Sequence, residues 1–275
     1  MIAIRRLSWF FLFLLAAALT ACGSDDDDGP APGTGGGSGG GSAPAAVELE
    51  QLAGTWAGPF DGTVAGGEPS AETQTLHFTI TGDQIDFHGF ADDRTGTIEK
   101  ATEVANAFRI QHSGGGGDAI RGMLLAIAGD TPYLLFVQEN GQFAAMQKIA
   151  DGGEEPTAPE YAQTDLDGTW SGLSARAADA QFSPLLQTTS SAACEAADAA
   201  SDCTVTIDEA ASIPAATRNA TGLALTGSGR WIGTYGDAGT AHVVLTHDKG
   251  FAGAVLCEDA FPQSCDLSAW TRSGG

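Results

Sequence analysis

A duplicated segment is the feature that most constrains how this 275-residue chain can fold. Residues 52–58 read LAGTWAG, and residues 166–172 read LDGTWSG, 114 positions later. The ends of the two units also match, because residues 133–141 and 242–250 each place an apolar run before a glycine turn. A repeat at this distance predicts two consecutive units of related structure, each the size of one small domain.

Composition sets the boundaries of these units. Residues 151–164 (DGGEEPTAPEYAQT) combine glycine, proline and acidic side chains, which is typical of a linker. We therefore expect folded domains at residues 47–150 and 165–275, each able to fold alone. The match between the unit ends places residues 251–255 opposite the end of the first unit. Residues 266–272 are then predicted to form an added strand.

The apolar periodicity is that of β-strands. In residues 73–81, Leu76, Phe78 and Ile80 alternate with polar side chains, which predicts a half-buried strand. After a turn, Ile85 and Phe87 continue the pattern, whereas the alanine-rich residues 192–200 look helical. Besides the Trp56 segment, the other expected strands lie at 95–101, 104–112, 119–128, 133–138, 142–149, 168–176, 184–191, 203–209, 220–226, 229–235, 240–247, 250–257 and 265–272.

Eight short antiparallel strands per unit can close into a barrel that has no free edge. Each unit opens with Gly-Thr-Trp, which resembles the Gly-x-Trp start of the lipocalin and avidin group, the calycins. The resemblance implies an all-β chain of two tandem small antiparallel barrels, in which Trp56 and Trp170 plug one end or border a ligand mouth. Simple packing of both tryptophans in a β core is the alternative. Apolar interior residues would either form core or line the mouth for a small apolar ligand: Leu76, Phe78, Ile85, Phe87, Leu124, Leu125 and Ile127.

The N-terminus carries an export signal. Two arginines precede the apolar residues 7–19, a run too short to span a bilayer comfortably. The next residues, Leu19-Thr20-Ala21-Cys22, resemble the lipobox of bacterial lipoproteins. This resemblance implies that residues 1–21 are a cleaved signal peptide and that Cys22 carries a lipid anchor to the membrane. An ordinary signal peptide with an incidental cysteine is the alternative.

The residues after Cys22 indicate placement. Gly23 stands where an aspartate would favour retention in the inner membrane, so the resemblance implies an outer-membrane lipoprotein on the periplasmic or cell-surface face. Residues 22–46 are dense in glycine, serine and proline and predict a disordered tether. The four aspartates at 25–28 are interpreted as a solvated charge run rather than a calcium site.

The charge of the chain excludes one class of partner. It has 35 acidic residues against 12 lysines and arginines, a formal net charge of −23. Nucleic-acid binding needs clustered basic side chains that neutralise phosphates, and the sequence has no such cluster. We expect an acidic protein of the cell envelope.

Four cysteines remain besides Cys22, and an even number in an exported chain predicts disulfides. We expect Cys194–Cys203 and Cys257–Cys265, because each pair brackets a short polar loop between expected strands. The other two connectivities stay possible from sequence. A metal site is the rival reading, but the sequence has neither a CxxC pair nor a nearby histidine to support it.

The sequence contains no convincing catalytic, metal or cofactor motif. His242 and His247 are five residues apart and are expected on opposite faces of one strand, and His77 is expected in solvent. The segment GLSAR at residues 172–176 lacks the second glycine of a nucleophile elbow. The glycine run at 114–117 has no lysine and no following helix, so it is no phosphate loop.

These observations favour a non-catalytic binding or envelope-interaction module anchored to the outer membrane, with a small apolar ligand or a protein as its partner. A surface lipoprotein that binds a host or carrier protein is the second hypothesis. An envelope hydrolase with an unrecognised site is the third.

Overall fold

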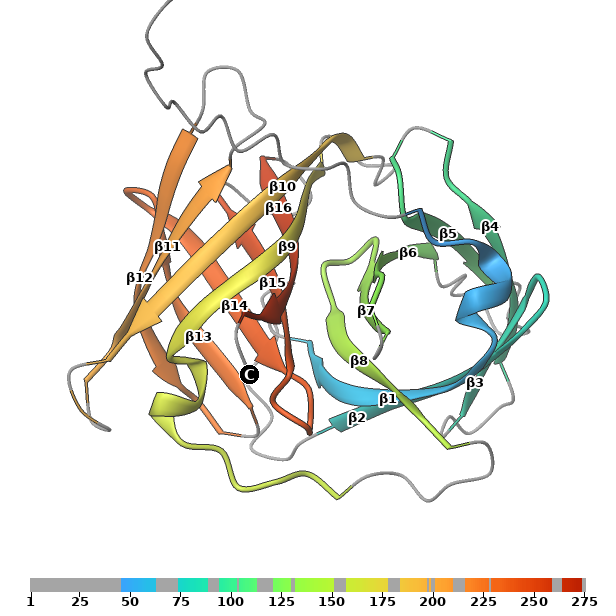
Figure 1. The fold of residues 1–275 in the computed structure, drawn as a ribbon, viewed down its shortest axis with the longest axis horizontal. Coiled ribbons are helices and arrows are strands. Elements are labelled where there is room, and N and C mark those ends of the chain that lie inside the picture. The colour runs from blue at the N-terminus through green and yellow to red at the C-terminus, as the bar shows by residue number, and fades with distance from the viewer. Residues whose placement is uncertain are drawn as a thin grey trace, which may run out of the picture. The chain divides into compact units, whose positions relative to one another are not determined.

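The computed structural model describes most of the chain after the expected tether (Figure 1). The signal peptide, Cys22 and nearly all of the tether lie outside the described residues, as do the 114–117 glycine run and part of the 151–164 linker. Among the described residues, no helix is long and apolar enough to cross a membrane. The described residues are 46–62, 74–88, 94–102, 104–112, 121–129, 132–150, 157–177, 184–196, 198, 201–209, 216–227, 229–258 and 264–273.

The chain is all-β and forms two closed antiparallel barrels of eight strands each, as the sequence predicts. Consecutive strands pair in each barrel, and the first strand also pairs with the eighth (Figure 1). This arrangement fits tandem lipocalin-like domains. The first barrel consists of β1 Gly54–Asp61, β2 Gln74–Thr81, β3 Gln84–His88, β4 Arg94–Lys100, β5 Ala107–His112, β6 Arg121–Ile127, β7 Tyr133–Gln138 and β8 Phe143–Ile149.

The second barrel repeats this order. It consists of β9 Gly168–Ala177, β10 Pro184–Glu195, β11 Cys203–Glu209, β12 Ala216–Leu225, β13 Arg230–Tyr235, β14 Gly239–Leu245, β15 Phe251–Cys257 and β16 Cys265–Arg272.

Two expectations about the second barrel are wrong. β16 is no addition, because it closes the barrel against β9 as β8 closes the first barrel against β1. The matched unit ends fall on β7 and β14, the seventh strand of one barrel and the sixth of the other, so they are not equivalent. The alanine-rich segment is also not helical where it is described, since Ala192–Glu195 continue β10. There the pairing with β9 and β11 overrides the helix propensity of alanine.

The repeated heptapeptide builds the closed end of each barrel. Leu52 and Leu166 end short 3₁₀ helices, η1 Leu49–Leu52 and η3 Gln163–Leu166. The indole N–H of the following tryptophan donates to that leucine carbonyl, at 2.8 Å for Trp56 and 3.1 Å for Trp170. Both indoles are buried. We refer to this end of each barrel, where the indole lies beside the 3₁₀ helix, as the plugged end.

The glycines of the repeat are explained by backbone geometry. Gly54 and Gly168 have φ of 127° and 128°, a region that residues with a side chain rarely adopt. A Cβ on Gly58 or Gly172 would lie 1.8 or 2.0 Å from a carbonyl oxygen of the closing strand. The repeat is thus conserved between the two units because both barrels have the same close approach of the first strand to the closing strand.

The first barrel has an apolar interior. Leu76, Phe78, Ile85 and Phe87 point into it, as the alternation predicts, and Leu124 joins them. Leu125, together with Ile127, was expected in the same interior but belongs to a different cluster. These residues lie on β6, where both faces are apolar, so the sequence alone does not distinguish inside from outside.

That different cluster is a core shared by the two barrels. It joins outward-facing residues of β5–β8 to outward-facing residues of β9 and β14–β16. Tyr133 stacks on Phe251 with 5.1 Å between ring centroids and 3° between planes, and its hydroxyl donates to Asp248 at 2.9 Å. The larger apolar members are Met123, Leu125, Ile127, Leu135, Val137, Phe143, Leu173, Val244, Phe251, Val255 and Leu267.

Candidate functional site: the polar interior of the second barrel

The second barrel has a polar interior at the end opposite its tryptophan plug. On β9, β10 and β16, Ser174, Ser190 and Ser268 share the inward face with Trp170 and Trp270, because residues two apart on a strand point the same way. The Ser174 hydroxyl lies 2.8 Å from both of the other serine hydroxyls. The Trp270 indole N–H donates to Ser190 at 2.9 Å. All three serines are buried.

Asp266 is the centre of a charged cluster next to these serines. It accepts hydrogen bonds from Arg176 at 3.0 and 3.3 Å, from the Tyr235 hydroxyl at 2.7 Å and from Arg218. The Asp266 side chain is 6% exposed, whereas those of Arg176 and Arg218 are 33% and 23% exposed. Four strands, β9, β12, β13 and β16, therefore deliver one carboxylate, two guanidinium groups and a phenol to one place.

The electrostatics of the cluster follow from these contacts. The hydrogen bond to Asp266 raises the pKa of Arg176 despite partial burial. Burial, and then the charge of Asp266, raise the pKa of Tyr235 well above its ordinary value. Tyr235 therefore stays protonated and acts as a hydrogen-bond donor. Glu258 lies 3.9 Å from Arg218 and is half exposed, which makes it a loose partner at the rim.

The cluster offers hydrogen-bond donors and acceptors. Among the described residues, no imidazole contacts Ser174, Ser190 or Ser268, so none of these hydroxyls has the adjacent base that activates a serine nucleophile. A guanidinium group has five N–H donors. Asp266 engages two of those of Arg176, and the remaining donors suit a carboxylate, phosphate or hydroxyl group of a ligand.

The first barrel is filled where the second is polar. With the tryptophans as reference, the strand registers make Ser174 equivalent to Phe60 and Ser190 equivalent to Leu76. Inside the first barrel, Phe78, Phe87 and Phe136 pack with ring centroids 5.6 to 6.1 Å apart. Replacing bulky apolar groups by serines gives the second barrel a polar interior on the same frame.

Sequence reasoning missed most of this cluster. It tested Ser174 and Arg176 as parts of a nucleophile elbow and found no match. A usable signal was the alternation of Trp170, Gly172, Ser174 and Arg176, which puts polar residues on the face that carries the tryptophan. What the sequence does not show is that Asp266 lies opposite Arg176 in the closing strand pair.

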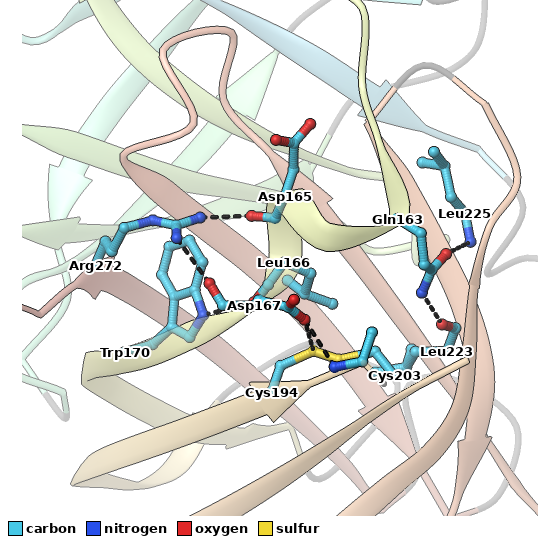
Figure 2. Close-up of a disulfide and its surroundings, with 11 residues drawn as sticks. Gln163, Asp165, Leu166, Asp167, Trp170, Cys194, Cys203, Leu223, Leu225 and Arg272 are labelled. Carbon is cyan, nitrogen blue, oxygen red and sulfur yellow. Dashed lines mark hydrogen bonds between the residues drawn. A yellow bond between two sulfur atoms is a disulfide. The ribbon is translucent and has the colours of Figure 1, made fainter. Parts of the chain in front are cut away.

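Both expected disulfides are present, Cys194–Cys203 and Cys257–Cys265. Cys194 and Cys203 lie in the second barrel near its plug, where the Asp167 carboxylate accepts from the Ala196 N–H at 2.9 Å (Figure 2). Asp167 with these two cysteines is the group of possible metal ligands found within the described part of the chain. Since the sulfurs are bonded to each other, this group offers no thiolate to a metal.

A cation completes the plug in both barrels. The Arg272 guanidinium lies 4.4 Å from the ring centre of Trp170 and donates to the carbonyl oxygens of Asp165 and Asp167 (Figure 2). Lys148 occupies the equivalent register position opposite Trp56, 5.8 Å from its ring centre.

The histidines lie apart from the polar interior. His242 is on β14 and its Nδ1 lies 3.3 Å from Asp61 of the first barrel, beside Arg230. β14 ends at Leu245, so His247 lies in the following turn rather than on the opposite face of the same strand. His77 is half-buried, with its ring 4.7 Å from that of His88, and is therefore less solvated than expected.

A cleft of about 620 Å³ lies where the two barrels meet. Its polar groups largely pair with one another: Lys249 with Asp165 at 2.7 Å, and Tyr133 with Asp248. The Tyr133–Asp248 pair joins the first barrel to the second, so we interpret the cleft as part of the joint.

No family model matches the chain, and a search of curated proteins finds no match. Among solved structures, the chain is similar to a protein of unknown function from the DUF3598 family of Nostoc punctiforme. The two share 12% identity with a TM-score of 0.35, and the alignment covers 82% of this chain and 97% of that one. A likeness at this level carries no functional argument.

Proposed function

We propose that this chain is a lipid-anchored, non-catalytic binding protein of the bacterial outer membrane, and that its second barrel holds a small polar ligand. The observation that carries the proposal is the Asp266 cluster above the three interior serines. The lipobox-like residues ending at Cys22 support the anchor, and the Gly/Ser-rich tether would separate the barrels from the lipid.

Stability alone does not account for the cluster. Burying charged groups costs free energy that their mutual attraction often only balances. The first barrel closes the same way with Phe60 and Leu76 at the positions of Ser174 and Ser190, so the frame does not require a polar interior. Polar groups that converge on one place, are costly to bury and reach solvent through two partly exposed arginines fit a ligand site.

The test is native mass spectrometry of the full chain purified in detergent. We expect the wild-type protein to carry a small molecule that is lost in Ser174→Phe, which copies the first barrel, and retained in Thr234→Phe on the outer surface. A wild-type protein that carries no more additional mass than Ser174→Phe, together with no binding in a screen of small organic acids and sugars, would refute the ligand site.

The anchor is tested separately. Cys22→Ser is expected to abolish incorporation of labelled fatty acid and to release the chain from membranes. If the variant still fractionates with membranes in both low and high salt, the lipid anchor is not what holds this protein.

A further inference from the structure

His112 in the first barrel is a buried side chain without a hydrogen-bond partner. It is the last residue of β5 and is 3% exposed. Neither of its ring nitrogens has a hydrogen-bond partner within the described part of the chain. Buried polar atoms are rarely left in this state, because the water they lose is normally replaced by another partner. A buried imidazole in this state is a candidate contact for a ligand.

The register places His112 inside the barrel mouth. Phe108 and Ile110 of the same strand point into the first-barrel core, and His112 follows on the same face. It lies at the end of the barrel opposite the Trp56 plug. Its partner on β4 is Gly96, so no side chain covers the imidazole from that position.

The surroundings of His112 combine an aromatic ring and a cation. The Phe87 ring meets the imidazole edge-on, at 6.3 Å and 78°. Arg94 is two residues from Gly96 on β4 and pairs with Phe87 in the ladder. Burial, and then the charge of Arg94, lower the pKa of His112. The neutral imidazole has one N–H donor and one acceptor nitrogen.

We propose that the mouth of the first barrel is a second binding site, for a small aromatic anion held by His112, Arg94 and Phe87. The His112 N–H and the Arg94 guanidinium donate to the anionic group, and the aromatic body packs against Phe87. This site is separate from the Asp266 cluster, since the two lie in different barrels, and it does not depend on the function proposed there.

The probe is anilinonaphthalene sulfonate, an aromatic anion that fluoresces in apolar surroundings. It is titrated into the full chain, with the detergent kept below the critical micelle concentration of that detergent. Saturable binding is expected, weakened about tenfold or more in His112→Phe and in Arg94→Met. His88→Phe, which changes an exposed histidine on β3, is the matched control and should bind as wild type. Ser174→Phe should also bind as wild type, which separates this site from the second barrel.

A spectroscopic measurement on the wild-type protein avoids dependence on variants that fold poorly. In ¹⁵N-labelled protein, the ring nitrogen signals of His112 should shift on addition of the probe, while those of His88 should not. Unsaturable binding, unchanged affinity in both variants or a silent His112 ring would overturn the proposal.

Discussion

At the scale of single residues, Asp266 is the buried acceptor at the centre of the charged cluster in the second barrel. It is nearly inaccessible to solvent and is the acceptor for two arginines and a tyrosine. Removing the charge of one partner in such a group leaves the others uncompensated, which costs more than replacing the whole group.

Asp266→Asn is therefore expected to lower the free energy of unfolding by about 2–4 kcal/mol, reduced from the fully buried case because both arginines are partly exposed. The combined replacement Asp266→Leu, Arg176→Met and Arg218→Met should recover most of this loss. Urea unfolding followed by circular dichroism measures both. An Asp266→Asn variant as stable as the wild type would show that the cluster is weakly coupled.

The tyrosines give a pH prediction. The chain has three, Tyr133, Tyr161 and Tyr235, and burial is the main cause that raises the pKa of each. The pKa of an unfolded tyrosine is about 10. Because the folded pKa is higher, this contribution to stability is complete below pH of about 10 and is lost as pH rises toward the folded pKa.

Spectrophotometric titration of the native protein should consequently show almost no tyrosinate at a pH where denatured protein is fully ionised. Any rise should coincide with loss of the β-sheet signal. Reversible ionisation of even one tyrosine near its ordinary pKa in folded protein would contradict this.

At the scale of elements, each barrel is closed at one end by a 3₁₀ helix, a tryptophan and a cation from the last strand. The two versions differ in strength. Arg272 lies closer to its tryptophan than Lys148 does. Arg272 also donates hydrogen bonds to the carbonyl oxygens of Asp165 and Asp167.

Arg272→Ala is expected to cost about 1–2 kcal/mol of unfolding free energy, from the lost cation–π contact and hydrogen bonds. Lys148→Ala, the matched change in the first barrel, should cost less than about 1 kcal/mol because it loses only a longer cation–π contact. Thermal and urea unfolding of the two variants provide the comparison. Equal effects would mean that the carbonyl contacts of Arg272 add nothing.

The strands and turns are the part of the fold that could be predicted from the sequence. Strands and their turns depend on local alternation, as at Leu76, Phe78 and Ile80, and eight strands per unit then favour a closed barrel. Which apolar face points inward is not local: Leu124 and Leu125 look equivalent in sequence, yet one lies inside the barrel and the other against its neighbour. The Asp266 cluster was beyond reach for the same reason, since its members come from β9, β12, β13 and β16.

At the scale of the whole molecule, the two barrels share a core, and this changes the expectation for the separated halves. Residues 47–150 and 165–275 each keep a closed sheet, but each would expose apolar side chains such as Leu125, Phe143 and Phe251. Exposed apolar patches of this kind promote association.

We expect the two fragments to form a one-to-one complex when refolded together, and the intact chain to unfold in one transition. Analytical ultracentrifugation and calorimetry measure these. Leu125→Asp, in the shared core, should abolish fragment pairing, whereas the exposed change Thr234→Asp should not. Two fragments that remain monomeric when mixed would restore the simpler picture of independent domains.

The shared core also joins largely equivalent faces. The first barrel uses the outer side of its fifth to eighth strands, and the second uses its first and its sixth to eighth. The sixth to eighth strands are thus common to both faces, and a contact between two equivalent faces closes on itself. Each barrel therefore covers the face that a further copy would need, which favours growth stopping at two.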